Sequence, residues 1–214
     1  MKEKFEYEDK VRFRKISQRY TKVKFDEHLF RKFFSVVNPS RWKGRIVLDI
    51  GCGEGIYVSK FAEEGSVIIG LDSSISVINI AKNNSQGAIF IRASATHLPI
   101  KEEVIDLCII IGLLQHFPDK FVEKTISEAN RVTHRDSVFI FDLKNSLNPF
   151  LYYRYKKNDS PDFTLKARSI KKIKSIINKH GFKINKRFTV PFPNRFAYLL
   201  GPLAPMFLLL CKKA

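Results

Sequence analysis

The sequence predicts an α/β fold built on a doubly wound, mostly parallel sheet. Two observations support this prediction. In the first, an apolar strand, Ile46 to Ile50, is followed by a turn with three glycines at alternate positions and then by an amphipathic helix. The second is a short, continuously apolar run, Val67 to Leu71, which is typical of a parallel strand buried on both faces. This alternation of strand, helix and strand predicts a right-handed crossover and a doubly wound sheet.

The turn after the first strand contains Gly51, Gly53 and Gly55. A side chain at these positions would block either the positive φ values of a tight turn or the close approach of a ligand to the backbone. The helix that follows presents the unpaired N–H groups of its first turn to that ligand. The spacing is not the G-x-G-x-x-G of nicotinamide sites, because the third glycine comes one residue early and Asp49 precedes the first by two.

This stretch resembles motif I of the class I S-adenosylmethionine-dependent methyltransferases in its order of hydrophobic residues, acid and G-x-G-x-G. Asp72, the Ser94-Ala95-x-x-Leu-Pro segment and a strand containing Asp106 follow in the family's order. The resemblance is strong over residues 45–143 and looser over 169–212. It implies a Rossmann-like sheet of seven strands with the last strand antiparallel. It also implies S-adenosylmethionine as cofactor and S-adenosylhomocysteine as product.

The remaining elements follow from the hydrophobic pattern and from cap residues. We expect helices within 5–34, over 56–64, after Ser73 or Ser74, over 118–132 and from Ser169 to Gly181, and a polar link over 38–42. Further strands are expected at 88–93, 104–111, 138–143, 183–190 and 206–212, and an insertion at 145–161. The predicted organisation is a single methyltransferase domain, 1–214. It comprises a helical leader (1–44), a cofactor-binding core (45–143), and substrate-side insertions with the final strands (144–214).

The predicted cofactor site combines the glycine turn with residues at the ends of the next strands. Asp72 lies 21 residues after Gly51, near the spacing at which an acid after the second strand accepts hydrogen bonds from a ribose diol. The alternative for Asp72 is a plain helix cap. Ser94 departs from the family, which commonly has there the Asp that receives the adenine amino group. The full predicted set is Asp49, Gly51, Cys52, Gly53, Gly55, Asp72, Ser73, Ser94, Ala95 and Gly112.

His116 is the predicted catalytic residue, as a general base or as a group that orients the acceptor. It follows the fourth strand at the carboxyl edge, where ligands bind in such sheets. The alternative is a histidine that hydrogen-bonds its own loop. Transfer of an activated methyl group otherwise requires alignment of the acceptor and exclusion of water. Four residues are predicted to line the substrate side: Tyr20, Tyr152, Tyr153 and Arg154.

The net charge of +17 is divided unevenly along the chain. Residues 1–45 have 14 Lys/Arg against 6 Asp/Glu, residues 46–144 have 9 against 13, and residues 145–214 have 15 against 2. Basic flanks around a mildly acidic core favour an anionic small-molecule or lipid-like acceptor, and they also suit peripheral contact with a membrane. Two alternatives stay open. One is RNA methylation, because the charge suits phosphate contacts, and the other is a non-catalytic, cofactor-binding partner subunit.

Cysteine and histidine usage predicts a reduced, metal-free protein. Cys52, Cys108 and Cys211 are far apart and show no C-x-x-C spacing, which favours free thiols in the cytoplasm. The five histidines show no metal-ligand spacing. No apolar segment follows the first lysines, which argues against a secretory signal. Residues 196–211 are uncharged, but Gly201, Pro202 and Pro205 interrupt them, so a buried or membrane-touching segment is expected, burial before membrane contact, and not a membrane span.

Overall fold

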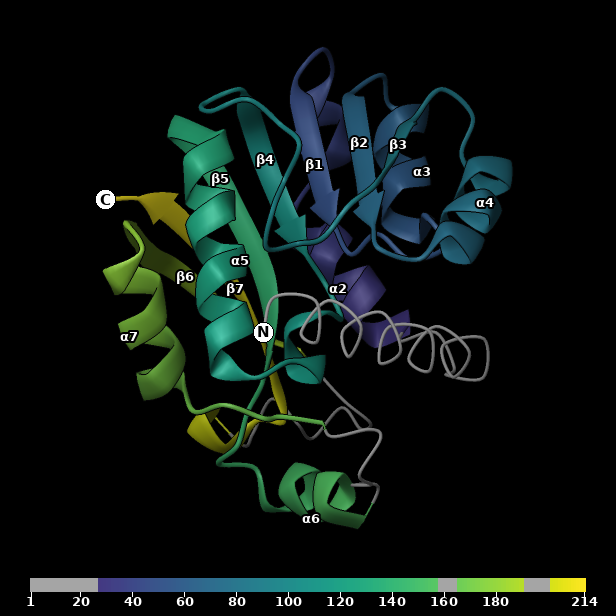
Figure 1. Cartoon of the computed structure of the whole chain (residues 1–214). Helices are drawn as coiled ribbons and strands as arrows, with labels where there is room; N and C mark the ends of the chain where they lie inside the picture. Colours follow the sequence, from purple (N-terminus) through teal and green to yellow (C-terminus); the bar gives the residue numbers. More distant parts are fainter. Residues whose placement is uncertain (1–26, 158–164, 191–200) are drawn as a thin grey trace, which may run out of the picture.

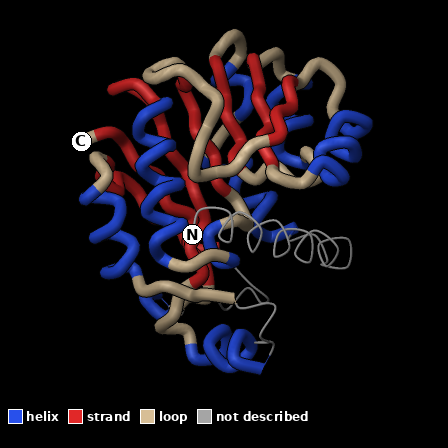
Figure 2. Tube along the Cα trace, viewed as in Figure 1, coloured by secondary structure: helices blue, strands red, loops and turns tan. Residues whose placement is uncertain are grey.

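The computed structural model describes residues 27–157, 165–190 and 201–214, and these form one sheet with helices on both faces (Figures 1 and 2). The strands are β1 Ile46–Ile50, β2 Val67–Asp72, β3 Ile89–Arg92, β4 Ile105–Ile110, β5 Thr133–Lys144, β6 Phe182–Val190 and β7 Met206–Lys213. The helices are α2 Glu27–Val36, α3 Ile56–Glu63, α4 Ile75–Asn84, α5 Asp119–Val132, α6 Pro149–Lys157 and α7 Ile170–Lys179. Short 3-10 helices include η1 Pro39–Trp42 and η2 Leu114–His116.

The strand order is β3-β2-β1-β4-β5-β7-β6. Strands β1 to β5 pair in parallel, whereas β7 is antiparallel to both β5 and β6. The predicted doubly wound sheet of seven strands with an antiparallel last strand is therefore confirmed. The order reverses between β1 and β4, and at such a switch point the loops after the two strands separate and leave a crevice for a ligand.

Alternate residues of β1 face two hydrophobic clusters on opposite sides of the sheet. Leu48 and Ile50 pack in the cluster that includes the buried faces of α5 and α7. Val47 packs in the other, which includes residues of α2 and α3. All three side chains are fully buried, and burial of an aliphatic side chain of this size contributes about 1.5–3 kcal/mol. Both faces being covered explains why the strand reads as an apolar run and not as an alternation.

Helix α2 packs against α3, the helix that follows the glycine turn. Phe33 is fully buried, and its ring centroid lies 5.0 Å from that of Tyr57 and 6.4 Å from that of Phe61, both in α3. The stretch 5–34, predicted as one or two helices, thus ends in α2, and the division of the chain into leader and core stays a prediction. The first part of the leader, with Tyr20, lies outside the described residues.

Two elements differ from the expectation. Strand β5 begins at Thr133 instead of residue 138, because Thr133 already pairs with Ile105 and the polar residues after it lie at an irregularity between two paired regions. The insertion contains a helix, α6, which the prediction lacked. Asn148 accepts a hydrogen bond from the backbone N–H of Leu151 (2.7 Å) and Pro149 is the first helical residue, so this dipeptide is a helix start that the sequence already contained.

The apolar residues near the end of the chain lie in the sheet. Residues 206–211 form most of β7, between β5 and β6, and their side chains are buried or nearly so. This part of the predicted buried segment is confirmed, and residues 196–200 lie outside the described part. Over the ranges that the structure describes, no helix is long and apolar enough to cross a bilayer.

Candidate cofactor site

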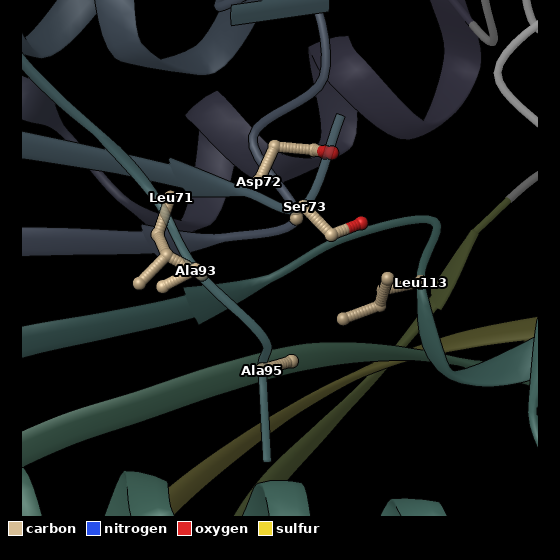
Figure 3. Close-up of a pocket in the computed structure, with 7 residues that line it drawn as sticks. Leu71, Asp72, Ser73, Ala93, Ala95 and Leu113 are labelled. Atoms are coloured by element: carbon tan, nitrogen blue, oxygen red, sulfur yellow. The ribbon is translucent and has the colours of Figure 1, made fainter. Parts of the chain in front are cut away.

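A small pocket opens at the carboxyl edge of the sheet, where β1, β2, β3 and β4 end. Figure 3 shows Asp72 and Ser73 on one side of it and Ala95 and Leu113 on the other. The full lining is Gly51, Leu71, Asp72, Ser73, Ala93, Ala95 and Leu113. Four of these belong to the predicted cofactor set. Sequence reasoning missed Leu71, Ala93 and Leu113, which end a strand or follow one and carry no reactive group.

The three glycines of the turn all have positive φ, as predicted, but their surroundings differ. The φ values of Gly51, Gly53 and Gly55 are 77°, 54° and 79°. A Cβ at Gly51 would lie 2.9 Å from Cδ1 of Leu113, and one at Gly55 would lie 3.2 Å from Cβ of Ala81 in α4. A Cβ at Gly53 would meet no protein atom within 4 Å. Gly55 therefore allows close packing of α4, whereas Gly53 leaves the backbone open to a ligand.

The carboxylate of Asp72 is tied to two loops. It accepts hydrogen bonds from the backbone N–H of Gly53 (3.3 Å) and of Ser74 (2.9 Å), and Ser74 is the residue before α4. Burial raises the pKa of Asp72, and the backbone hydrogen bonds counter part of that rise. Next to it, the buried Oγ of Ser73 has no hydrogen-bond partner among the described residues. This end of the pocket therefore offers one carboxylate and one uncommitted hydroxyl group.

Asp49 supplies a second carboxylate beneath the turn. Its side chain is 2% exposed, and its Oδ2 has no hydrogen-bond partner in the described part of the chain. Burial, and then the charge of Asp72, raise the pKa of Asp49 to about 7. A buried carboxylate without a partner is costly, so this position favours either a proton or a nearby positive charge.

Three other predicted residues mainly support loops. Cys52 is 7% exposed, and burial raises the pKa of its thiol, so the thiolate that would react is disfavoured. The Oγ of Ser94 lies 2.9 Å from Oγ1 of Thr96. The N–H of Gly112 donates to Oδ1 of Asp142 (2.7 Å). None of the three lines the pocket, and their roles toward a cofactor stay predictions.

His116 lies in η2, after β4, and is 6% exposed. The amide nitrogen of Gln115 donates to the carbonyl of Gly112 (2.8 Å) and lies 3.3 Å from Nε2 of His116. Because the carbonyl fixes which amide atom is the nitrogen, its second hydrogen is available to an imidazole lone pair. This contact suits a histidine that stabilises its own loop. The general-base role stays a prediction, and His116 is not among the residues that line the pocket.

The predicted substrate residues lie on the insertion. Tyr152 and Tyr153 are in α6 and are 60% and 67% exposed. Arg154 belongs to the same helix, and Tyr20 lies outside the described residues. Figure 1 shows α6 below the carboxyl ends of β1 and β4. The structure thus places two exposed aromatic side chains on the ligand-binding side of the sheet but does not bring them into the pocket.

Among the residues that the structure describes, no three His, Cys, Asp or Glu side chains are grouped to hold a metal ion. The polar groups that line the pocket are instead the carboxylate of Asp72, the hydroxyl of Ser73 and the backbone of Gly51, and the carboxylate of Asp49 is buried in β1, two residues before Gly51. Such a set can bind an organic ligand that carries hydroxyl groups and positive charge.

Comparison with known proteins gives one family and several relatives. The family model of a methyltransferase domain matches residues 48–141. A malonyl-[acyl-carrier protein] O-methyltransferase from Hamiltonella defensa is 33% identical over 95 residues, which are 44% of this chain and 36% of that protein. The chain spans between about a third and a half of the length of the first curated relatives that it matches.

Solved structures share the fold at low sequence identity. An S-adenosylmethionine-dependent methyltransferase structure from Listeria monocytogenes has a TM-score of 0.68 at 14% identity, covering 88% of this chain and 97% of that one. The magnesium protoporphyrin IX methyltransferase from Synechocystis PCC 6803, solved with bound SAH, has a TM-score of 0.67 at 17% identity. That match covers 95% of this chain and 86% of the other.

Proposed function

The core of this chain is a methyltransferase domain of the class I fold, and we propose that it binds S-adenosylmethionine and transfers the methyl group to an anionic, partly apolar acceptor. The observation that carries the proposal is the open backbone of Gly53, hydrogen-bonded to Asp72, in the turn that directly follows the strand with the buried Asp49. Two structures of a protein with the same fold are described as having SAM or SAH bound.

The residues at the pocket fit such a cofactor. A ribose diol can donate to the carboxylate of Asp72, which lies at the end of β2 and lines the pocket. The uncommitted Oγ of Ser73 can take a further hydrogen bond. A positively charged ligand would relieve the cost of the unpaired Oδ2 of Asp49. We therefore assign the ribose to Asp72 and the favourable field for the positive charge to Asp49.

The bound cofactor would supply a sulfonium methyl group that is already activated for transfer. The chain has to hold the acceptor in line, keep water away and accept a proton where the acceptor loses one. Leu71, Ala93, Ala95 and Leu113 give the pocket an apolar wall that excludes water. We propose that His116, in the loop after β4, takes the proton, once its contact with Gln115 is released.

The acceptor class is inferred from charge and exposed aromatic groups. Residues 145–214 carry 15 basic against 2 acidic residues, and α6 exposes Phe150, Tyr152 and Tyr153. Basic and aromatic groups together suit a carboxylate or phosphate attached to an apolar body. Two similar proteins have names that state acceptors of this kind, namely malonyl-[acyl-carrier protein] and magnesium protoporphyrin IX. The same surface would allow peripheral contact with an anionic membrane.

A competing function is methylation of RNA, which the net charge of +17 favours. Salt dependence separates the two acceptors. Contacts with many phosphates make affinity fall steeply with ionic strength, whereas an acceptor with one or two anionic groups gives a shallow slope. A third outcome, cofactor binding without transfer, would indicate a partner subunit.

The test uses the purified full chain. Calorimetry measures the affinity for S-adenosylmethionine, and labelled cofactor then reports methyl transfer to cell extract separated into RNA, lipid and small-molecule fractions. Label in the lipid or small-molecule fraction, lost in Asp72→Ala and kept in Asp136→Ala, would support the proposal. Asp136 is an exposed aspartate in β5 outside the pocket, so it controls for removal of a carboxylate. Label in RNA alone would overturn the acceptor class, and absence of cofactor binding would overturn the whole assignment.

A further inference from the structure

A buried arginine, Arg168, lies beside the loop that carries His116. Its side chain is 6% exposed. The guanidinium donates to the backbone carbonyls of Leu114 (Nη1, 2.9 Å) and Phe117 (Nη2), and to the carboxylate of Asp119 (Nε, 2.8 Å). These three acceptors span η2 and the first residue of α5. One side chain therefore joins both ends of a short turn to the helix after it.

The same loop is also fixed at its other end. The N–H of Gly112 donates to Asp142 of β5, and the backbone N–H of Lys166 donates to the carbonyl of Gln115 (2.7 Å). The loop 112–117 is thus held by groups from two separate segments, β5 and residues 166–168, and Asp119 of α5 in turn accepts a hydrogen bond from Arg168. Hydrogen bonds within the loop, such as that from the His116 N–H to the carbonyl of Leu113 (3.1 Å), join residues that are close in sequence. The outside groups connect the loop to parts of the chain that are distant in sequence.

Arg168 also lies where the chain returns from the insertion. Its backbone N–H donates to the carbonyl of Lys144 (2.8 Å), and its own carbonyl accepts from the N–H of Ser146 (3.2 Å). Residues 144–146 precede α6, and residue 168 comes just before α7. In Figure 1 the segment that enters α7 runs beneath the start of α5. Arg168 therefore connects both ends of the insertion that carries α6 to the loop of His116.

We propose that Arg168 is a positioning residue for the acceptor half of the site, fixing the loop 112–117 and coupling it to the insertion that bears α6. The proposal deepens the proposed function, on which its kinetic part rests. The side-chain hydrogen bonds of Arg168 go to residues that do not line the pocket. We expect its loss to disturb turnover and acceptor binding far more than cofactor affinity.

The geometry requires an arginine at this position. A guanidinium is a planar fork with five N–H groups, and it can serve two carbonyls and a carboxylate that lie in different directions. The ammonium of a lysine would keep the ion pair with Asp119, but as a point charge it cannot bridge the two carbonyls. If the charge alone fixes the loop, Arg168→Lys should leave amide exchange in 113–117 unchanged. If the bonds to both carbonyls fix the loop, Arg168→Lys should speed that exchange.

The experiment compares Arg168→Lys and Asp119→Asn with the wild type by hydrogen exchange and by cofactor calorimetry. Loss of the bonds to both carbonyls is expected to speed amide exchange across 113–117 by roughly tenfold or more, since each charged hydrogen bond contributes more than a neutral one. Asp119→Asn keeps both carbonyl bonds and removes one charge that is 45% exposed, so it should change exchange only a few-fold. The cofactor affinity should stay within a few-fold in both variants.

Arg131→Lys provides a matched control. Arg131 donates to the carbonyls of Leu98 (Nη2, 3.0 Å) and Ile100 (Nη1, 2.9 Å) and pairs with Glu128, so it fixes a different loop by the same chemistry. Its variant should speed exchange around residues 98–100 and leave 113–117 unchanged. This control separates a local effect of Arg168 from a general loss of stability.

The outcomes decide the proposal with or without an identified acceptor. Faster exchange in 113–117 for Arg168→Lys, with cofactor affinity retained, supports it, and a fall in kcat or a rise in acceptor KM adds the kinetic part. The proposal is overturned if amide exchange in 113–117 is unchanged in Arg168→Lys. It is also overturned if the cofactor affinity of this variant falls by as large a factor as the exchange rate rises. If the wild type transfers no methyl group, the proposed function fails, but exchange and cofactor affinity still decide the role of Arg168.

Discussion

The carboxylate of Asp72 accepts a hydrogen bond from the backbone N–H of Gly53, with 3.3 Å between the nitrogen and Oδ2. This bond joins the end of β2 to the turn after β1, so two parts of the predicted cofactor site are held together by the protein's own groups. Groups held in place in this way lose less entropy on binding. The turn and the strand end should therefore act as one preformed unit toward the cofactor.

The first prediction concerns the open backbone at Gly53. Gly53→Ala should weaken cofactor binding at least tenfold, because the new methyl group occupies the space through which the ligand approaches. Gly87→Ala is a matched control: Gly87 also has positive φ (80°, against 54° for Gly53), and its Cβ would likewise meet no atom within 4 Å. Both variants should lose about 1 kcal/mol of stability from backbone strain. Equal cofactor affinity of the two folded variants, measured by calorimetry, would contradict the assignment.

The second prediction concerns Asp72 itself. Asp72→Ala removes the hydrogen-bond acceptor for the ribose and also the hydrogen bonds to Gly53 and Ser74. The free energy of cofactor binding should therefore become less favourable by about 1.5–3 kcal/mol, the range for charge-assisted hydrogen bonds. Calorimetry with S-adenosylhomocysteine, which has the same ribose, should give a loss of similar size. Asp136→Ala should bind both ligands as the wild type does. If Asp72→Ala also did, Asp72 would be only a helix cap.

The fold could be predicted largely from one repeated relation between sequence and burial. Strands such as β1 and β2 are apolar apart from one aspartate each because both faces of the sheet are covered, and glycines mark the turns. Strand β5 was predicted too short because polar residues between Thr133 and Val138 interrupt that pattern, while pairing with β4 is present on both sides of them, at Thr133 and again from Val138. Such pairing depends on a neighbouring strand that is distant in sequence, which a local pattern does not report.

The site was predictable where a backbone requirement selects a residue type. The positive φ of the turn favours glycine, and Asp72 was predicted from its spacing of 21 residues after Gly51, at the end of β2. Leu113 and Arg168 could not be found in the same way. Leu113 lines the pocket only because β4 lies next to β1, and Arg168 reaches its partners across about 50 residues of sequence. Nothing local distinguishes this arginine from the other basic residues of its region.

The third prediction concerns His116. If it is the general base, His116→Ala should lower kcat about a hundredfold or more and leave the cofactor affinity unchanged. His134→Ala is the control, because His134 pairs with Asp106 near the start of β4, at the opposite edge of the sheet. The measurement is single-turnover methyl transfer on the identified acceptor. A rate within a few-fold of wild type would show that His116 only supports its loop through Gln115.

The fourth prediction is a dependence of stability on pH. The folded pKa of Asp49 is raised from 3.8 to about 7, so between these values the unfolded chain releases this proton while the folded chain keeps it. The contribution of Asp49 to the free energy of unfolding should therefore fall as pH rises through this window and level off above pH 7. The side-chain amide of the Asp49→Asn variant does not titrate in this range. Chemical unfolding of this variant and of wild type from pH 4 to 8 should give stability curves that diverge with rising pH in favour of the variant, and parallel curves would refute the raised pKa.

The last prediction links the same carboxylate to the cofactor. S-adenosylmethionine carries a sulfonium charge and S-adenosylhomocysteine does not, so ionised Asp49 should favour the former. Because the free protein protonates Asp49 with a pKa of about 7, affinity for S-adenosylmethionine should rise from pH 5.5 to 7.5, while affinity for S-adenosylhomocysteine changes less. In Asp49→Asn the difference in pH dependence between the two ligands should disappear. The charge of Asp72 is the second cause of the raised pKa, so Asp72→Asn should move the midpoint of the rise to lower pH. Calorimetry of both ligands across this pH range provides the measurement. If the affinities of the wild type for the two ligands depended on pH in the same way, Asp49 would have no role in recognising the positive charge.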